Sequence, residues 1–282
     1  MIKGARVAES DKVFAGSIPE IYDRLFVPLI FEPYAEDLAA RVAAIRPMRV
    51  LELAAGTGVV TRALAARLPA EARIIATDLN QPMLDQAAAR QKGDARIVWQ
   101  QADAQTLPFE DRSFDAVVCQ FGVMFLPDRV NAYREVLRVL KPGGGYFFNA
   151  WDRIADNEFA DVVTEAVAAL FPSDPPRFLA RTPHGYHDAD QIRAEVSAAG
   201  FGAITLETIE YRSRAKSPLD PAIAYCQGSP LRNEIEARDK AGLDRATKAA
   251  AVALARRFGA GAIDGRIQAH VVVAMRAPRE LI

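Results

Sequence analysis

Apolar and polar positions follow two distinct rhythms along the first half of the chain. Short apolar runs bounded by turn residues are typical of buried strands, and longer segments with apolar residues every three to four positions are typical of helices. Strands that alternate with helices form βαβ units, so the pattern predicts an α/β fold with a doubly wound, mostly parallel sheet. The strand patterns are at 50–53, 72–78, 96–103, 114–121 and 146–150, and the helical patterns at 62–68, 82–91 and 131–140.

The second half of the chain adds further helices and two more strands. Helical patterns occupy 159–171 and 188–199, and a helical insertion covers 219–258. Apolar and polar residues alternate near 204–212 and again near 266–275. Such alternation is typical of strands, and we expect these two to complete the sheet.

The N-terminal residues are predicted to be helical and are rich in aromatic side chains. We expect Pro28 to break the first helix, because proline lacks the N–H group that continues a helical ladder. The chain is therefore divided into an N-terminal helical lid, a ligand-binding core, and a C-terminal part that completes the sheet and adds a helical cover. These parts are residues 1–45, 46–151 and 152–282.

A buried strand, a tight turn and the start of a helix follow one another at 50–61. Gly56 and Gly58 lie in this turn, and a glycine lets the backbone approach a ligand because it has no Cβ. The N–H groups at the start of the following helix have no partner within the helix and point toward the same place. The stretch therefore predicts a nucleotide-like ligand.

Three acidic residues lie at the carboxyl ends of consecutive predicted strands. They are Glu52, Asp78 and Asp103. Ligands of open parallel sheets bind at this edge, where Asp78 is placed to accept hydrogen bonds from ribose hydroxyls and Asp103 from an exocyclic amine such as adenine N6. For any one of these acids a helix cap or a solvated turn is the simpler interpretation. All three in register favour a bound adenosine.

The glycine pattern argues against a dinucleotide. The dinucleotide fingerprint is Gly-x-Gly-x-x-Gly, whereas Gly58 is followed by Val-Val-Thr, so the third glycine is absent. Ala54, two residues before Gly56, occupies a position where a glycine is expected. A nicotinamide-dependent oxidoreductase is therefore the less favoured alternative.

The composition excludes several other classes of protein. The 282 residues carry a net charge of −1 without long charged blocks, which gives no electrostatic reason to expect nucleic acid or an anionic membrane as a partner. No apolar run reaches the length of a membrane span, and the N-terminus lacks the apolar region of a signal peptide. The two cysteines are far apart, so we expect a reduced, cytoplasmic protein.

Five blocks of sequence, in order, resemble those of class I S-adenosylmethionine (SAM)-dependent methyltransferases. The first, Leu-Glu-Leu-Ala-Ala-Gly-Thr-Gly, is similar to the acid-x-Gly-x-Gly-x-Gly of motif I. Leu-Pro-Phe followed by Ser-Phe-Asp-Ala-Val is typical of the small-molecule branch that includes ubiquinone and menaquinone biosynthesis methyltransferases. The resemblance covers roughly residues 45–150, and its blocks are at 51–58, 76–83, 101–104, 107–117 and 137–144.

The resemblance implies a Rossmann-like sheet of seven strands, with an antiparallel last strand inserted between strands five and six. It also implies SAM as the cofactor. Ala54 in place of the first glycine adds only a methyl group, which is tolerable if φ there is negative. The residues implied at the cofactor are Glu52, Ala54, Gly56 and Gly58 in motif I, Asp78 at the ribose, Leu79, Met83, Asp103 and Ala104 around the adenine, and Gln120 and Phe121 near the sulfonium.

The predicted activity is SAM-dependent methyl transfer to a small organic acceptor by in-line displacement. The enzyme must chiefly align the reactants and exclude water, and it needs a general base only if the acceptor loses a proton. No Asp/Asn-Pro-Pro-Tyr/Phe motif follows strand four, so amino-methylation of nucleic-acid bases is not supported. A non-catalytic SAM-binding module stays an alternative, and a homodimer is left open.

The residues of the acceptor pocket and any catalytic base are less well defined by the sequence. His184 and His187 are interpreted as part of a loop, because a third metal ligand is missing. We therefore predict no metal and assign no catalytic residue. Candidate pocket residues, for which ordinary packing is the competing explanation, are Tyr22, Phe31, Trp151, Phe178 and Tyr186.

Overall fold

The computed structural model describes residues 8–278 and contains one mixed sheet of seven strands in the order β3-β2-β1-β4-β5-β7-β6. Strand β7 is antiparallel to both neighbours, β5 and β6, whereas the other neighbouring strands are parallel. The predicted fold is therefore confirmed, including the insertion of the last strand. The strands are β1 (Arg49–Glu52), β2 (Arg73–Asp78), β3 (Ile97–Gln101), β4 (Phe114–Gln120), β5 (Leu140–Trp151), β6 (Ala203–Ala215) and β7 (Ile263–Met275).

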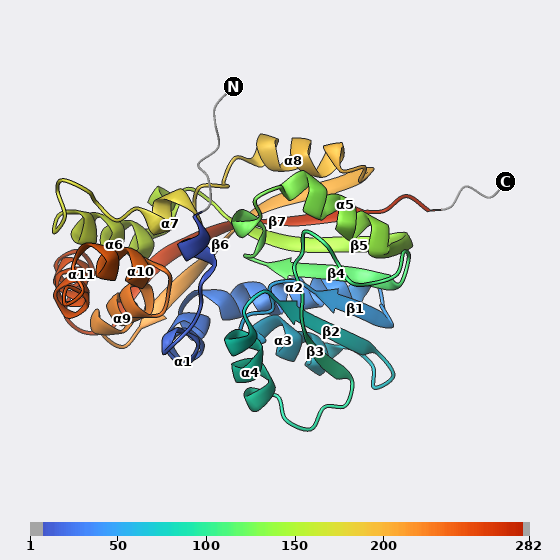
Figure 1. Cartoon of the computed structure of the whole chain (residues 1–282), viewed down its shortest axis with the longest axis horizontal. Coiled ribbons are helices and arrows are strands. Elements are labelled where there is room, and N and C mark those ends of the chain that lie inside the picture. Colours follow the sequence, from blue (N-terminus) through green and yellow to red (C-terminus); the bar gives the residue numbers. More distant parts are fainter. Residues whose placement is uncertain (1–7, 279–282) are drawn as a thin grey trace.

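Helices cover both faces of this sheet (Figure 1). On one face α2 and α3 bury apolar side chains such as Leu38 and Leu64 against β1, β2 and β4. On the other face α5 packs against β5 and α8, with Tyr133 beside Phe148. Helix α4 packs against β2 and β3. These helices are α2 (Glu32–Ala44), α3 (Val59–Arg67), α4 (Gln81–Arg90), α5 (Arg129–Val139) and α8 (Ala189–Ala198).

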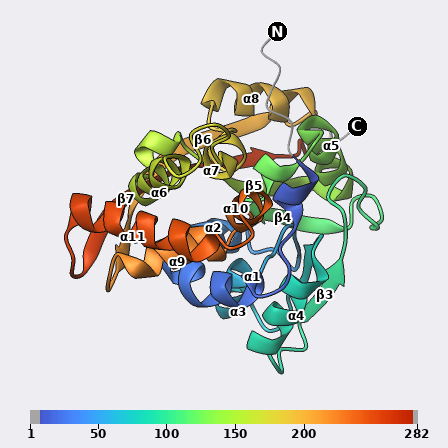
Figure 2. The same cartoon turned by 60° about the vertical axis from the view of Figure 1, so that its left-hand side comes forward.

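The remaining helices of the second half gather at one end of the molecule, away from β2, β3 and α4 (Figures 1 and 2). Helix α11 lies against α6 and α9, and α10 packs against α7, α9 and α11. We call this group the helical cover. Its members are α6 (Glu158–Ala168), α7 (Phe178–Arg181), α9 (Leu219–Gln227), α10 (Leu231–Arg238) and α11 (Leu243–Phe258), and the short turn η4 (Ile154–Asp156) precedes it.

The predicted helix break at Pro28 is wrong. The chain remains helical from α1 (Ile18–Ile21) through η2 (Tyr22–Phe31) into α2, because η2 is a π-helix. In this wider turn Glu32 donates its N–H to the Val27 carbonyl, five residues earlier. The wider spacing accommodates the proline, which has no N–H to donate and would clash in a regular α-helix. Two further short turns are η1 (Glu9–Lys12) and η3 (Val123–Phe125). Residues 1–7 of the predicted lid lie outside the described residues.

Several strand boundaries also differ from the prediction. Strand β3 ends at Gln101, and Asp103 follows it in an isolated bridge with Thr106. Strands β6 and β7 are longer than expected because they continue to pair with each other, as far as Ala215 opposite Ile263, beyond the last residue of β5. Alternation of apolar residues weakens in that extension, so the sequence pattern did not reveal its full length.

Candidate functional site

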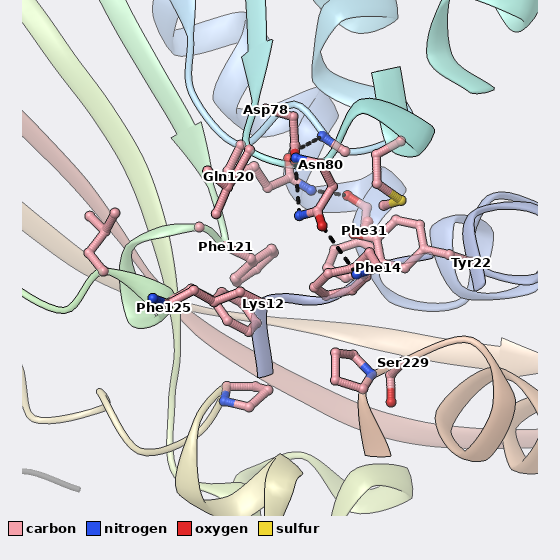
Figure 3. Close-up of a pocket in the computed structure, with 18 of the residues that line it drawn as sticks. Lys12, Phe14, Tyr22, Phe31, Asp78, Asn80, Gln120, Phe121, Phe125 and Ser229 are labelled. Atoms are coloured by element: carbon pink, nitrogen blue, oxygen red, sulfur yellow. Dashed lines mark hydrogen bonds between the residues drawn. The ribbon is translucent and has the colours of Figure 1, made fainter. Parts of the chain in front are cut away.

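A cavity opens at the carboxyl edge of the parallel strands (Figure 3). Asp78, Asn80 and Gln120 lie at one side of it and Ser229 at the opposite side, with Phe14 and Phe121 between them. Many of the residues that line this cavity are among those that the sequence analysis named as candidates. They are Tyr22, Phe31, Ala54, Gly56, Asp78, Leu79, Met83, Asp103, Ala104, Gln120, Phe121, Trp151 and Phe178.

Residues 54–58, which we call the glycine turn, follow β1. Three of them have left-handed backbone conformations. The φ angles are 51° at Ala54, 55° at Gly56 and 80° at Gly58. The condition of a negative φ, under which the Ala54 methyl group was expected to be tolerated, is therefore not met. A left-handed conformation costs an ordinary residue about 1–2 kcal/mol relative to glycine, so surrounding contacts must hold it.

Gly58 does not line the cavity, contrary to the prediction. A Cβ at this position would lie 2.8 Å from the ring of Trp99 and 3.2 Å from the Ala87 Cβ. A glycine is therefore required at this position, because the turn packs closely against strand β3 and helix α4. Gly56, in contrast, lines the cavity, and a Cβ there would meet nothing closer than 3.6 Å.

Asp78 holds the glycine turn in place. One carboxylate oxygen accepts the Gly56 N–H at 2.8 Å, and the other accepts the Asn80 N–H at 2.8 Å. Asp78 is only 7% exposed, and its burial raises the pKa of the carboxyl group although the hydrogen bonds from Asn80 and Gly56 oppose the shift. The carboxylate joins the end of β2 to the glycine turn and still lines the cavity.

The strained conformation at Ala54 gives a stability prediction. Ala54→Gly is expected to raise the free energy of unfolding by about 0.5–1 kcal/mol, because glycine adopts this φ without strain. Urea denaturation measures the change. The matched control is Ala55→Gly, because Ala55 is a buried neighbour without positive φ. We expect this control to lower the free energy of unfolding by a similar amount. A loss of stability in Ala54→Gly equal to that of the control would contradict the account.

Glu52 lies behind the glycine turn and does not line the cavity, so the prediction that it contacts a ligand there is not supported by its position. It is 1% exposed and accepts a hydrogen bond from the Thr61 hydroxyl at 2.5 Å. Its side chain is directed to α3, while its backbone carbonyl accepts from Thr77. Burial raises the pKa of the Glu52 carboxyl group to about 8, against the hydrogen bond from Thr61. Burial therefore favours the neutral form of Glu52 in the folded chain.

This shift predicts a pH-dependent stability. The pKa of Glu52 is about 8 when folded and 4.5 in a model chain, so its stabilising contribution is complete below 4.5 and is lost as the pH rises through 8. As the pH rises from 6 to 8.5, ionisation of Glu52 should lower the free energy of unfolding by roughly 2–3 kcal/mol.

In Glu52→Gln that pH-dependent loss should disappear, whereas the exposed control Glu71→Gln should behave as the wild type. Urea denaturation at the two pH values measures the difference. The same loss in Glu52→Gln as in the wild type would show that another group causes it.

The adenine side of the predicted site is formed by residues after β2 and β3. Leu79 is 45% exposed, whereas the neighbouring Met83 is buried, and both line the cavity. Asp103 is exposed and folds its carboxylate back to accept the Gln105 N–H at 2.9 Å. Asn80 accepts the Phe14 N–H at 3.3 Å, which brings the N-terminal segment to this side of the cavity.

The other half of the cavity is aromatic. Phe121, which has a φ of 51°, stacks on Trp151 with ring centroids 3.7 Å apart. Phe31 lies beside this pair and is stacked on Tyr22 at 5.1 Å. Gln120 donates to the Phe31 carbonyl at 3.0 Å, and its Oε1 has no hydrogen-bond partner among residues 8–278. This half of the cavity therefore offers largely apolar surface, because the unpaired oxygen of Gln120 is covered by protein atoms.

Tyr186 is the one candidate pocket residue that lies elsewhere. Its hydroxyl is 3.2 Å from that of Tyr133, and the Arg129 guanidinium lies over its ring at 4.1 Å. The packing of α5 against α8 therefore accounts for it. His184, two residues earlier, does line the cavity, and the sequence interpretation of it as an ordinary loop residue missed this. The other aromatic residues of the cavity that the sequence did not indicate are Phe14, Phe26, Phe125 and Tyr225.

Two general features of the described residues bear on function. No group of three or more histidine, cysteine or acidic side chains within residues 8–278 is arranged to hold a metal ion. Within the same range, no helix combines the length and the apolar character that crossing a bilayer requires. The His187 ring bonds to the His184 carbonyl at 2.8 Å, so the two histidine rings do not point at a shared ligand.

Comparison with known proteins gives one consistent family. A family model described as a methyltransferase domain matches residues 50–144. The ubiquinone/menaquinone biosynthesis C-methyltransferase UbiE of Idiomarina loihiensis is 30% identical over 182 residues, which cover 60% of this chain and 70% of that protein. The demethylmenaquinone methyltransferase of Clavibacter sepedonicus is 45% identical over 103 residues, which cover 36% of this chain and 41% of that protein.

Solved structures with the same fold are more distant in sequence. The [4+2]-cyclase SpnF is 18% identical with a TM-score of 0.63, and the match covers 98% of this chain and 99% of that one. A phosphoethanolamine N-methyltransferase of Haemonchus contortus is 17% identical with a TM-score of 0.58, covering 93% of this chain and 57% of that one. At these identities the likeness shows the fold alone.

Proposed function

Because the chain belongs to the class I SAM-dependent methyltransferases, we propose that it methylates a small, largely apolar acceptor bound in the aromatic half of the cavity. The observation that carries this proposal is the composition of that half, where the packed rings of Phe31, Phe121 and Trp151 line the cavity. Sites of this kind bind apolar molecules and orient them with a few polar groups. The family assignment favours methyl transfer over the nicotinamide-dependent oxidation that the sequence left as an alternative.

The other half of the cavity has the chemistry that SAM requires. Asp78 offers carboxylate oxygens to the ribose hydroxyls, and Asp103 offers one to the adenine amine. Leu79 and Met83 provide apolar surface for the base. Gln120 also lines the cavity, although its unpaired Oε1 is covered by protein atoms. When bound, SAM supplies an electrophilic methyl group, and these residues hold it in position.

The names of the relatives agree with an apolar acceptor. Those names assign C-methylation in ubiquinone and menaquinone biosynthesis to the relatives themselves. For this chain we propose the broader class, an acceptor with an apolar ring that fits against Phe121 and Trp151.

The role of Asp78 gives a direct test of the cofactor site. Asp78→Ala should weaken binding of S-adenosylhomocysteine by about 1–3 kcal/mol, or roughly 5- to 150-fold, because charge-assisted hydrogen bonds are lost. Titration calorimetry measures the dissociation constant. Asp85→Ala on α4 is the control, since Asp85 is exposed and does not line the cavity. An unchanged dissociation constant in Asp78→Ala would remove this residue from the site.

We also propose that residues 8–17, the N-terminal segment, close the cavity together with the helical cover. Lys12 and Phe14 line the cavity from this segment. Asp11 is 1% exposed and is bound by Arg181 of α7 through two hydrogen bonds, at 2.5 and 2.9 Å. Arg181 also donates to Glu234 of α10 at 2.7 Å. One arginine thus ties the N-terminal segment to two helices of the cover.

If this segment acts as a lid, its attachment controls ligand exchange. Arg181→Met should speed the release of S-adenosylhomocysteine several-fold, because it leaves Asp11 without its charged partner and loosens the segment. Stopped-flow displacement measures the release rate. The control is Arg177→Met, which removes an exposed ion pair with Glu165 close to the same helix. Equal release rates in the two variants would contradict the lid.

A further inference from the structure

His184 presents an unusual nitrogen to the cavity. Its Nδ1 lies 2.8 Å from the backbone carbonyl of Asp152, just after β5. A carbonyl oxygen can only accept, so Nδ1 carries the hydrogen and Nε2 has a free lone pair. Nε2 makes no hydrogen bond with any of residues 8–278, and it is not one of the fully covered polar atoms. His184 lines the cavity, so Nε2 is an acceptor open to a ligand there.

The surroundings keep this imidazole neutral. Burial lowers the pKa of His184 to about 4, although the hydrogen bond to Asp152 opposes the shift. The nearby His187 lowers this pKa further, and the Asp152 carboxylate raises it slightly. That carboxylate is occupied by Gln268 and by the Arg153 N–H, both at 2.7 Å. The other ionisable side chains that line the cavity are Lys12, Tyr22, Asp78, Asp103 and Tyr225.

His184 also lies against the aromatic half of the cavity. Its ring centroid is 5.9 Å from that of Trp151, which stacks on Phe121. The free nitrogen is therefore in the half of the cavity where we propose that the methyl acceptor binds. Asp78 lies in the half that we propose for SAM.

We propose that Nε2 of His184 accepts the hydrogen of a hydroxyl or N–H group on the methyl acceptor and takes up its proton during methyl transfer. This rests on the function proposed above and narrows the acceptor to a molecule with such a donor. The O–H or N–H bond breaks, and its electron pair, on that atom or delocalised to a ring carbon, forms the new bond to the methyl carbon. The carbon–sulfur electron pair stays on sulfur, and the proton passes from Nε2 to water.

The test uses 1-naphthol and naphthalene as probes, with the full-length protein saturated with S-adenosylhomocysteine. His184→Asn should bind 1-naphthol about 3- to 10-fold more weakly than the wild type, relative to naphthalene, because one hydrogen bond is lost. Asparagine can still donate to the Asp152 carbonyl, so the loop should keep its position. The control is His187→Asn, which changes a neighbouring histidine that does not line the cavity. Fluorescence titration gives the affinity of each of the three proteins for each probe.

A second measurement uses the wild-type protein alone. In ¹⁵N NMR spectra of the histidine rings, His184 should be the Nδ1–H tautomer down to about pH 5, and 1-naphthol should shift its Nε2 signal. An Nε2–H tautomer, an unmoved signal, absence of 1-naphthol binding, or equal probe discrimination in wild type and His184→Asn would each overturn the proposal. Failure of S-adenosylhomocysteine itself to bind would instead defeat the proposed function, and this inference with it.

Discussion

The hydrogen bond from the Gly56 N–H to the Asp78 carboxylate is the interaction on which the site depends. Ala54 has a positive φ that an alanine adopts only with strain, so the glycine turn is unfavourable at this position on its own. Asp78 lies at the end of the neighbouring strand and fixes this turn through one oxygen, while the other holds the Asn80 N–H. The carboxylate is largely buried, and the two backbone donors offset part of the unfavourable free energy of burying it.

The same cavity carries two chemically different halves because different strands end at its edge. The ends of β1, β2 and β3 bring backbone turns and carboxylates, which suit the ribose and base of a nucleoside. The ends of β4 and β5 bring Phe121 and Trp151, whose stacked rings give an apolar surface to the half where we propose that the methyl acceptor binds. Methyl transfer needs both properties, a polar anchor for the donor and a dry surface for the reaction.

The fold was largely predictable because each strand and helix carries its own periodic pattern. The acids at strand ends were predictable for the same reason, since parallel strands bring their carboxyl ends to one edge. The conformation of Ala54 was not, because its turn is held by bonds to residues distant in the sequence. The Ala55 N–H donates to the Thr77 carbonyl and the Gly56 N–H to Asp78. Glu52 shares the register of the other acids, yet its side chain is directed behind the turn to Thr61.

Loop residues were the hardest to place. His184 and Tyr186 are two positions apart, and only the path of the loop, fixed by the Asp152 carbonyl and by Tyr133, decides which one reaches the cavity. Phe14 was missed because its contact with Asn80 joins distant parts of the chain. Pro28 was misjudged because a π-helix accommodates it.

The most direct test of this account is a crystal structure of the protein with S-adenosylhomocysteine bound. The account predicts that the ribose hydroxyls donate to Asp78 while the Gly56 N–H bond is retained, and that the sulfur atom faces Phe121. A ligand bound elsewhere, or a ribose without contact to Asp78, would contradict the central claim that this carboxylate organises both the turn and the cofactor.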